Sequence, residues 1–218
     1  MHMGRLTDTE QMRIYFTNKI GGIFDYSYDS KHIFKEIPSD NLRQYITRFV
    51  KEGVLRKISK GIYVIGESTS SDKERIIKHY TSCSDGVIGG DYLLYQLGII
   101  ENEPEKVVVL TRATIGNKII RKKNIELIST RSIFTRFDHT IDIIKAIEII
   151  SHSSINNASA IAVLTNLLKG YTDRAFRENI EIIYKRIVYI RLANILNTMG
   201  ISNMVMDIYA NKTSVWFI

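Results

Sequence analysis

Residues 38–65 read PSDNLRQYITRFVKEGVLRKISKGIYVI, and this stretch decides the expected fold of the first part of the chain. Pro38 ends any helix before it, because proline disfavours helical backbone in the preceding residue. Ser39 is a favourable N-cap and Gly53 can adopt the left-handed conformation that ends a helix, so we expect a helix between them. β-Branched and aromatic residues on both sides of a short turn at residues 59–61 then predict a β-hairpin.

The predicted helix has one apolar and one polar face when its residues are placed at 100° intervals. The apolar side chains fall within one arc; they are Leu42, Tyr45, Ile46, Phe49 and Val50. The opposite face carries Asp40, Asn41, Gln44, Thr47, Arg48 and Lys51, with Arg43 on its flank. Arg can pair with guanine, and Gln or Asn with adenine, in the major groove of DNA. Lys, Thr and the free N–H groups at the helix start can hold phosphates. This face therefore suits a recognition helix.

The residues around this helix predict a winged helix-turn-helix. Thr7 or Asp8 can cap a helix that runs to about Lys19, and Ser30 can cap a short helix over residues 31–35. The short helix would brace the next one, as the first helix of a helix-turn-helix does. The hairpin would be the wing, with basic residues at or near its tip. The residues expected to contact DNA are Ser39, Asn41, Arg43, Gln44, Thr47, Arg48, Lys51, Arg56, Lys57 and Lys60.

A small, polar segment from Gly66 to Asp72 follows the hairpin and is the best linker in the chain. It predicts two domains: residues 1–66, the winged helix-turn-helix, and residues 67–218, a larger mixed α/β domain rich in helices. The expected fold class is therefore α+β. Residues 1–66 hold 11 basic and 7 acidic residues, and the other residues hold 19 and 16, so positive charge is denser in the smaller domain.

The second domain combines helical and strand patterns. We expect helices over residues 72–82 and 89–97, and strands over 107–110, 119–120 and 125–128. From Asp138 onward the pattern becomes helical, with one or two helices over 176–198. The apolar end, residues 214–218, is either a last strand or a point where the chain is cut short.

Bulk properties favour a cytoplasmic protein with an anionic partner. The chain has 218 residues and a formal net charge of +7. A basic balance suits nucleic acid. No apolar run approaches the length of a membrane span, and the first residues lack the apolar stretch of a secretory signal. Cys83 is the single cysteine, so we expect neither an internal disulfide nor a cysteine-based zinc site; a small helix residue is its favoured role.

No catalytic pattern stands out, so we expect a protein that is not an enzyme and has no cofactor or metal. The glycines of residues 85–91 are in the wrong order for a dinucleotide loop and favour a turn and helix entry. Asp138, His139 and Asp142 could suggest an acid–base or metal site, but an N-cap with acidic residues in the first turn is favoured. A second basic cluster could extend the DNA surface, meet an acidic partner or guard exposed strands; it comprises Arg112, Arg121, Lys122, Lys123, Arg131 and Arg136.

Three segments resemble AbiEi-type antitoxins of type IV toxin–antitoxin systems and the related DUF6088 group. They are residues 42–55 with 60–63, the helix GDYLLYQLGI at 90–99, and the strand VVVLTR at 107–112. The resemblance implies a transcriptional autorepressor that binds operator repeats, and an antitoxin that counteracts a nucleotidyltransferase-like toxin. By position it gives the DNA role to Gln44, Thr47, Arg48 and Lys51. It assigns antitoxicity to the C-terminal domain as a whole.

Two other functions stay open at this stage. The winged helix could contact a protein instead of DNA, in which case binding would lack a steep dependence on salt. Less favoured is a nuclease in the C-terminal half, which would need Asp138 or His139. Whether the protein would bind paired repeats as monomers or as a dimer is also open.

Overall fold

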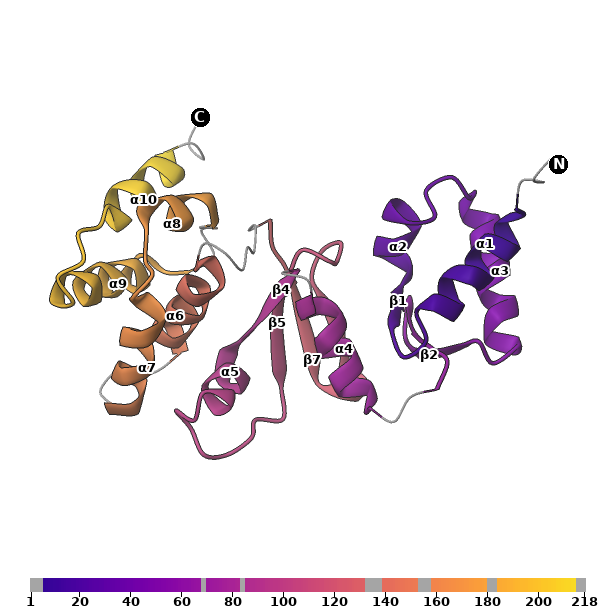
Figure 1. Cartoon of the computed structure of the whole chain (residues 1–218), viewed down its shortest axis with the longest axis horizontal. Helices are drawn as coiled ribbons and strands as arrows, with labels where there is room; N and C mark the ends of the chain where they lie inside the picture. Colours follow the sequence, from indigo (N-terminus) through magenta and orange to yellow (C-terminus); the bar gives the residue numbers. More distant parts are fainter. Residues whose placement is uncertain are drawn as a thin grey trace.

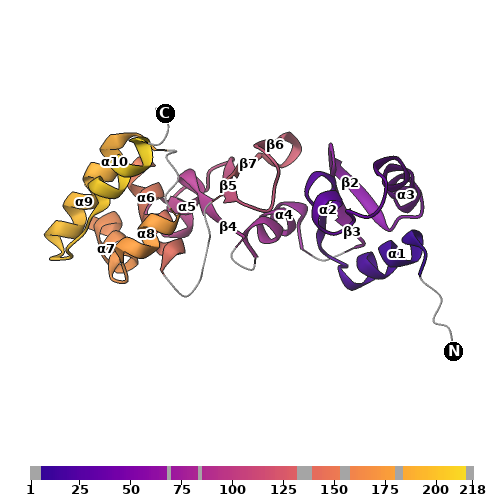
Figure 2. The same ribbon diagram turned by 90° about the horizontal axis from the view of Figure 1, so that it is seen from above.

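A computed structural model describes residues 6–67, 70–82, 85–131, 139–152, 158–179 and 184–214. The fold is mixed α+β, as predicted, with two small sheets. Figures 1 and 2 show three groups of elements in a row. An N-terminal group of helices and a sheet lies at one end, a second sheet lies in the middle, and a group of helices lies at the other end.

The N-terminal group contains three helices and a three-stranded antiparallel sheet. Its elements are α1 (Asp8–Asn18), β1 (Ile23–Asp25), α2 (Tyr26–His32), α3 (Ser39–Lys51), β2 (Leu55–Ser59) and β3 (Ile62–Ile65). The strand order is β1-β3-β2. The predicted helices ending near Lys19 and running between Ser39 and Gly53, and the β2–β3 hairpin, are confirmed. The short helix expected over residues 31–35 is wrong in its bounds, because α2 ends at His32. Strand β1 was not predicted, because three residues are too few to show an alternating pattern.

Helix ends confirm two sequence predictions and correct two others. Thr7 caps α1 in a capping box with Glu10, and Gly53 after α3 has a φ of +75°, as expected. Ser30 does not cap α2, because Asp25 at the end of β1 accepts a hydrogen bond from the Ser27 amide and starts the helix earlier. Ser39 is the first residue of α3 rather than its cap, since the extended backbone of Pro38 precedes it directly.

Aromatic rings fill the core of the N-terminal group. Phe16 of α1 makes edge-to-face contacts with Phe24 of β1 and Phe49 of α3, with ring centroids 5.5 and 5.2 Å apart. Phe34 closes the same cluster between α2 and α3. Such pairs add to the stabilisation from apolar burial. They fix α3 against α1 and the sheet, so the face of α3 that points outward is set by this core.

The middle group contains a four-stranded sheet flanked by helices. Its elements are α4 (Asp72–Thr81), β4 (Gly86–Gly89), α5 (Gly90–Gln96), β5 (Val107–Thr111), β6 (Lys118–Ile120), a 3-10 turn (Arg121–Lys123) and β7 (Ile125–Ser129). The order is β4-β5-β7-β6, and β5 and β7 are parallel. The turn expected at residues 86–89 is a strand instead. A Cβ on Gly86 would lie 2.3 Å from the Tyr80 carbonyl oxygen, so this strand needs glycine to approach α4.

The C-terminal group is helical. It contains α6 (Thr140–His152), α7 (Ala158–Leu168), α8 (Asp173–Asn179), α9 (Arg186–Thr198) and α10 (Val205–Ser214), which share one hydrophobic cluster with α5. Buried Glu148 of α6 accepts hydrogen bonds from the Gly90 amide, at 2.7 Å, and from the Tyr184 hydroxyl, which ties α6 to the start of α5. Helix α10 was not predicted. Cys83 and residues 215–218 lie outside the described residues.

The N-terminal sheet is buried on both faces. One face packs against α1 and α3 through residues that include Phe24, Leu55 and Ile65. The other face packs against α4 and the middle sheet; this cluster includes Ile23, Ile62, Val64, Ile76, Tyr80, Val107 and Val109. The predicted linker therefore joins parts that share a hydrophobic core. The domain boundary at residue 66 stays a prediction.

Candidate nucleic-acid interface

The outward face of α3 gathers five of the residues predicted to contact DNA. Leu42, Ile46 and Phe49 are buried on the inner face, as expected, while Val50 is 37% exposed and only borders the core. The outer face forms an open depression of about 410 Å³, lined by Arg43, Gln44, Thr47, Arg48 and Lys51. Ser39 and Asn41 are also exposed, at the start of the helix. A helix whose inner face is fixed by the core can enter a DNA groove with its polar side chains outward and without rearranging.

Contacts from α1 hold the end of α3. The Arg13 guanidinium forms an ion pair with Glu52 just after the helix, at 2.7 Å, and lies 5.3 Å from the centre of the Phe49 ring. The pair is exposed and worth little by itself. Because Arg13 pairs with Glu52, the sequence neighbour of Lys51, that carboxylate does not pair with Lys51, and the charge of Lys51 stays available to a ligand.

The polar side chains of α3 differ in the ion pairs and hydrogen bonds that they form within the protein. Arg43 lies 3.6 Å from Asp40, and the Thr47 hydroxyl donates to the Arg43 carbonyl at 2.8 Å. Thr47 must therefore rotate before it can donate to a phosphate. Within the described residues, Arg48 and Lys51 form no ion pair. Their charges are the ones most directly presented by this face.

The hairpin places its three predicted DNA contacts differently. Lys57 and Lys60 are exposed, and Lys60 lies at the turn beside Gly61, whose φ is +74°. Arg56 lies further from the turn than expected. It forms two hydrogen bonds with Asp72 at the start of α4, at 2.6 and 3.2 Å, and these bonds lower the pKa of Asp72 to about 2. The charge of Arg56 is thereby balanced within the protein.

A buried polar network that was not predictable from local sequence patterns joins the N-terminal group to the middle sheet. The Asp25 carboxylate is fully buried and accepts hydrogen bonds from the Tyr80 hydroxyl of α4, at 2.7 Å, and from the Lys118 ammonium of β6, at 2.5 and 2.7 Å. Burial alone would raise the pKa of Asp25, but the bonds from Lys118, Tyr80 and Ser27 outweigh it and lower the pKa. The carboxylate is therefore held charged at the junction.

Arg75 of α4 forms a second tie across the same junction. Its Nε donates to the Gly21 carbonyl at 2.7 Å, and its Nη2 donates to the Ile65 carbonyl at 2.9 Å. Both carbonyls lie at the same end of the β1–β3 ladder, where the Gly21 amide itself donates to the Ile65 carbonyl at 2.8 Å. Together with Asp25, Arg75 fixes the direction in which α3 and the hairpin point relative to the rest of the molecule.

Asp29 gives the N-terminal group a pH dependence. It is 4% exposed, and burial raises its pKa to about 7 despite the hydrogen bond from the Asp25 amide. Because the folded state holds this proton more tightly than the unfolded state, the contribution of Asp29 to stability is greatest below about pH 4 and is lost as the pH rises through about 7.

Asp29→Asn should therefore raise the free energy of unfolding at pH 8 but not at pH 4. Urea unfolding at pH 4 and at pH 8 measures the free energy of unfolding, and Asp40→Asn, at an exposed position, is the control. Parallel pH profiles for Asp29→Asn and wild type would contradict it.

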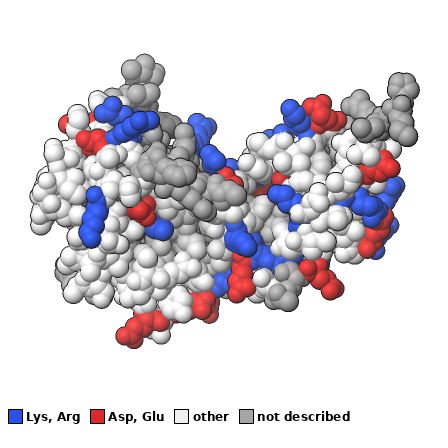
Figure 3. All heavy atoms as spheres, in the orientation of Figure 1, with Lys and Arg blue, Asp and Glu red and all other residues white. Residues whose placement is uncertain are grey.

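Two members of the second basic cluster are paired with carboxylates. Arg112 forms an ion pair with Asp85 at 3.0 Å, and Lys123 with Asp72 at 3.1 Å. Arg136 and Asp138 lie outside the described residues. Figure 3 shows basic and acidic side chains interspersed over the visible face, so no single-sign surface appears there. The outward face of α3 is therefore the better-defined basic site.

The start of α6 carries a histidine and an aspartate close together. His139 Nδ1 lies 3.4 Å from Asp142, but His139 has a φ of +52° and precedes α6, so the two residues do not share a helix face. In the described part of the chain, no group of three His, Cys, Asp or Glu side chains could hold a metal ion. Each helix of the described residues is too short or too polar to cross a bilayer. Comparison of the sequence with models of protein families and with curated proteins finds no match.

Proposed function

We propose that residues 6–66 form a winged helix-turn-helix that binds double-stranded DNA, with α3 in the major groove and the β2–β3 hairpin as the wing. The observation that carries the proposal is the outward face of α3, where Arg43, Gln44, Arg48 and Lys51 line one depression while the opposite face is buried. The order of elements supports it: residues 33–38, ending in Pro38, connect α2 to α3, and a hairpin with exposed Lys57 and Lys60 follows directly.

We infer in addition that the protein is an autorepressor and an antitoxin of a type IV, AbiE-like system, without enzymatic activity of its own. This part rests on the resemblance of residues 42–55, 60–63, 90–99 and 107–112 to AbiEi-type antitoxins. The partners would be operator DNA with inverted repeats and a nucleotidyltransferase-like toxin. The C-terminal helices would carry antitoxicity as a unit.

Gln44 should contribute to sequence preference. It lines the α3 depression, and its amide can form a bidentate pair with adenine. Gln44→Ala should weaken binding to the preferred site by about 1–3 kcal/mol while leaving binding to random DNA nearly unchanged. Fluorescence anisotropy titrations with both duplexes measure the ratio of the affinity for the preferred site to the affinity for random DNA. Equal losses on the two duplexes would place Gln44 outside base recognition.

Co-expression tests the antitoxin proposal. The chain should restore growth to cells that express a nucleotidyltransferase-like toxin encoded beside it, and Arg48→Ala/Lys51→Ala should restore growth equally well when expressed from an independent promoter. Failure of the wild-type chain to restore growth would contradict the antitoxin role and leave the DNA-binding proposal intact.

A further inference from the structure

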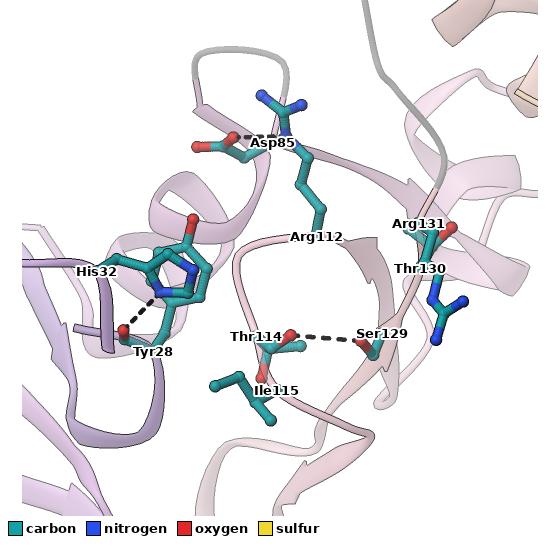
Figure 4. Close-up of a pocket in the computed structure, with 9 residues that line it drawn as sticks. All are labelled: Tyr28, His32, Asp85, Arg112, Thr114, Ile115, Ser129, Thr130 and Arg131. Carbon is teal, nitrogen blue, oxygen red and sulfur yellow. Dashed lines mark hydrogen bonds and ion pairs between the residues drawn. The ribbon is translucent and has the colours of Figure 1, made fainter. Parts of the chain in front are cut away.

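A second depression, of about 480 Å³, lies where the N-terminal group meets the middle sheet (Figure 4). Tyr28 and His32 of α2 form one side of it. Thr114 and Ile115, from the loop after β5, lie across from them, and Arg112 lies above. Asp85, Ser129, Thr130 and Arg131 complete the lining. The volume is in the range that small-molecule sites occupy.

The depression lies at the carboxyl ends of the two parallel strands. β5 ends at Thr111 and β7 ends at Ser129, and the lining residues of the sheet follow directly after them. After β5 the chain leads to β6, beside β7; after β7 it leads to α6, which contacts β4 at the other edge. The loops that follow both strands therefore meet outside the same carboxyl ends, which is the side of a parallel sheet on which ligands bind.

Thr114 provides an independent sign of a missing partner. Its side chain is 4% exposed and lines the depression, yet within the described residues its hydroxyl forms no hydrogen bond. Burying a hydroxyl without a partner costs free energy, and native proteins rarely tolerate it without a reason. The loop itself is well held, because the Ser129 hydroxyl donates to the Thr114 carbonyl at 3.3 Å. The hydroxyl is shielded from solvent as it stands, and rotation of the Thr114 side chain about χ1 would present it to a ligand oxygen in the depression.

Arg112 supplies positive charge beside Thr114. Asp85 holds it through Nε, at 3.0 Å, and among the described residues its two terminal nitrogens form no hydrogen bond. Arg131 and His32 add further basic groups to the rim, against the single carboxylate of Asp85. Guanidinium groups and hydroxyls together favour phosphate, because the guanidinium donates two parallel hydrogen bonds to it.

The α2 side of the depression is flat and aromatic. The rings of Tyr28 and His32 stack with centroids 4.0 Å apart and an interplanar angle of 21°. The His32 Nδ1 lies 2.8 Å from the Tyr28 carbonyl, which fixes the ring. Ile115, 40% exposed, lies opposite. A planar group can pack between such surfaces, as nucleobases do on aromatic side chains.

We propose that this depression binds a nucleoside phosphate, with the phosphate on Arg112 and Thr114 and the base against the Tyr28–His32 pair. The proposal does not depend on DNA binding by α3. No covalent step is implied. The ligand would contact both α2 and the middle sheet, so binding would also stabilise the junction between them.

Isothermal titration of the full chain with AMP, adenosine and inorganic phosphate tests the proposal. AMP should bind more tightly than either fragment. Thr114→Val removes the hydroxyl and keeps the shape, and Arg112→Gln removes the charge; each should weaken AMP binding about tenfold. The matched controls are Thr165→Val and Arg121→Gln, which change exposed or helix-bonded groups elsewhere and should leave AMP binding unchanged.

Thermal unfolding separates a lost ligand contact from a folding defect in these variants. Thr114→Val should unfold at the same temperature as wild type or higher, because it removes an unsatisfied buried hydroxyl. Weaker AMP binding in this variant therefore reports on the ligand contact. No binding of AMP, or equal AMP binding by wild type and both variants, would overturn the proposal. Equal affinities for AMP and phosphate would overturn the role of the aromatic pair. Loss of DNA binding in the variants, without any AMP binding, would instead assign the depression to the DNA backbone.

Discussion

Lys118→Met should lower the free energy of unfolding by about 3–5 kcal/mol, because it leaves the Asp25 carboxylate buried without its cation. Asp25 is fully buried, and Lys118 forms its only ion pair among the described residues. The Tyr80 and Ser27 hydrogen bonds remain, which places the expected loss toward the lower end of that range. Urea unfolding followed by circular dichroism at pH 7 measures the loss.

Lys106→Met is the matched control. Lys106 also lies 2.5 Å from a carboxylate, that of Glu126, but its side chain is 64% exposed, so its loss should cost at most about 1 kcal/mol. Asp25→Asn combined with Lys118→Met should recover part of the stability that Lys118→Met loses, because it removes the buried charge. Equal losses in Lys118→Met and Lys106→Met would show that the network does not hold the junction.

Local patterns allowed the N-terminal helices and the hairpin to be predicted. The face of α3 was predictable because its apolar residues recur at helical spacing, and the structure buries Leu42, Ile46 and Phe49 as expected. The Thr7 side chain caps the start of α1. Gly53, which has no side chain, adopts the left-handed backbone conformation that ends α3. Each of these signals acts within a few residues of the chain.

Contacts between distant residues could not be predicted. Asp25 caps α2 and also meets Tyr80 and Lys118, which lie 55 and 93 residues further along. Arg56 looks like a wing residue in sequence, yet Asp72 engages it. Gly86 looks like a turn residue, but a strand needs it because α4 approaches so closely. A single sequence has no pattern that marks such pairs.

The candidate DNA face followed from sequence, whereas the depression at the carboxyl ends of β5 and β7 did not. The α3 residues recur every three or four positions along one helix, so their spacing predicts a shared face. The second depression combines α2 with loops that follow two strands. The parallel pairing of β5 with β7 brings the loops together, and the Asp25 network brings α2 to them. Arg112 and Arg131 were noted in sequence as basic, but Thr114 and Tyr28 carried no signal.

Arg48→Ala/Lys51→Ala should weaken DNA binding about a hundredfold at low salt. Both charges lie on the α3 face and form no ion pair among the described residues, so each can make a charged hydrogen bond worth about 1.5 kcal/mol. Each phosphate contact that is lost should also lower the slope of log affinity against log salt by about 0.9. Stability should change little, because both side chains are exposed.

A salt-titrated gel shift on the DNA upstream of the protein's own gene tests the central claim most directly. It compares wild type, Arg48→Ala/Lys51→Ala, and Lys169→Ala/Arg191→Ala, a control that removes two exposed charges from the C-terminal helices. We predict specific binding that weakens steeply with salt, collapses in the α3 variant and persists in the control. Wild-type binding with no preference over random DNA, or equal losses in the two double variants, would contradict the account.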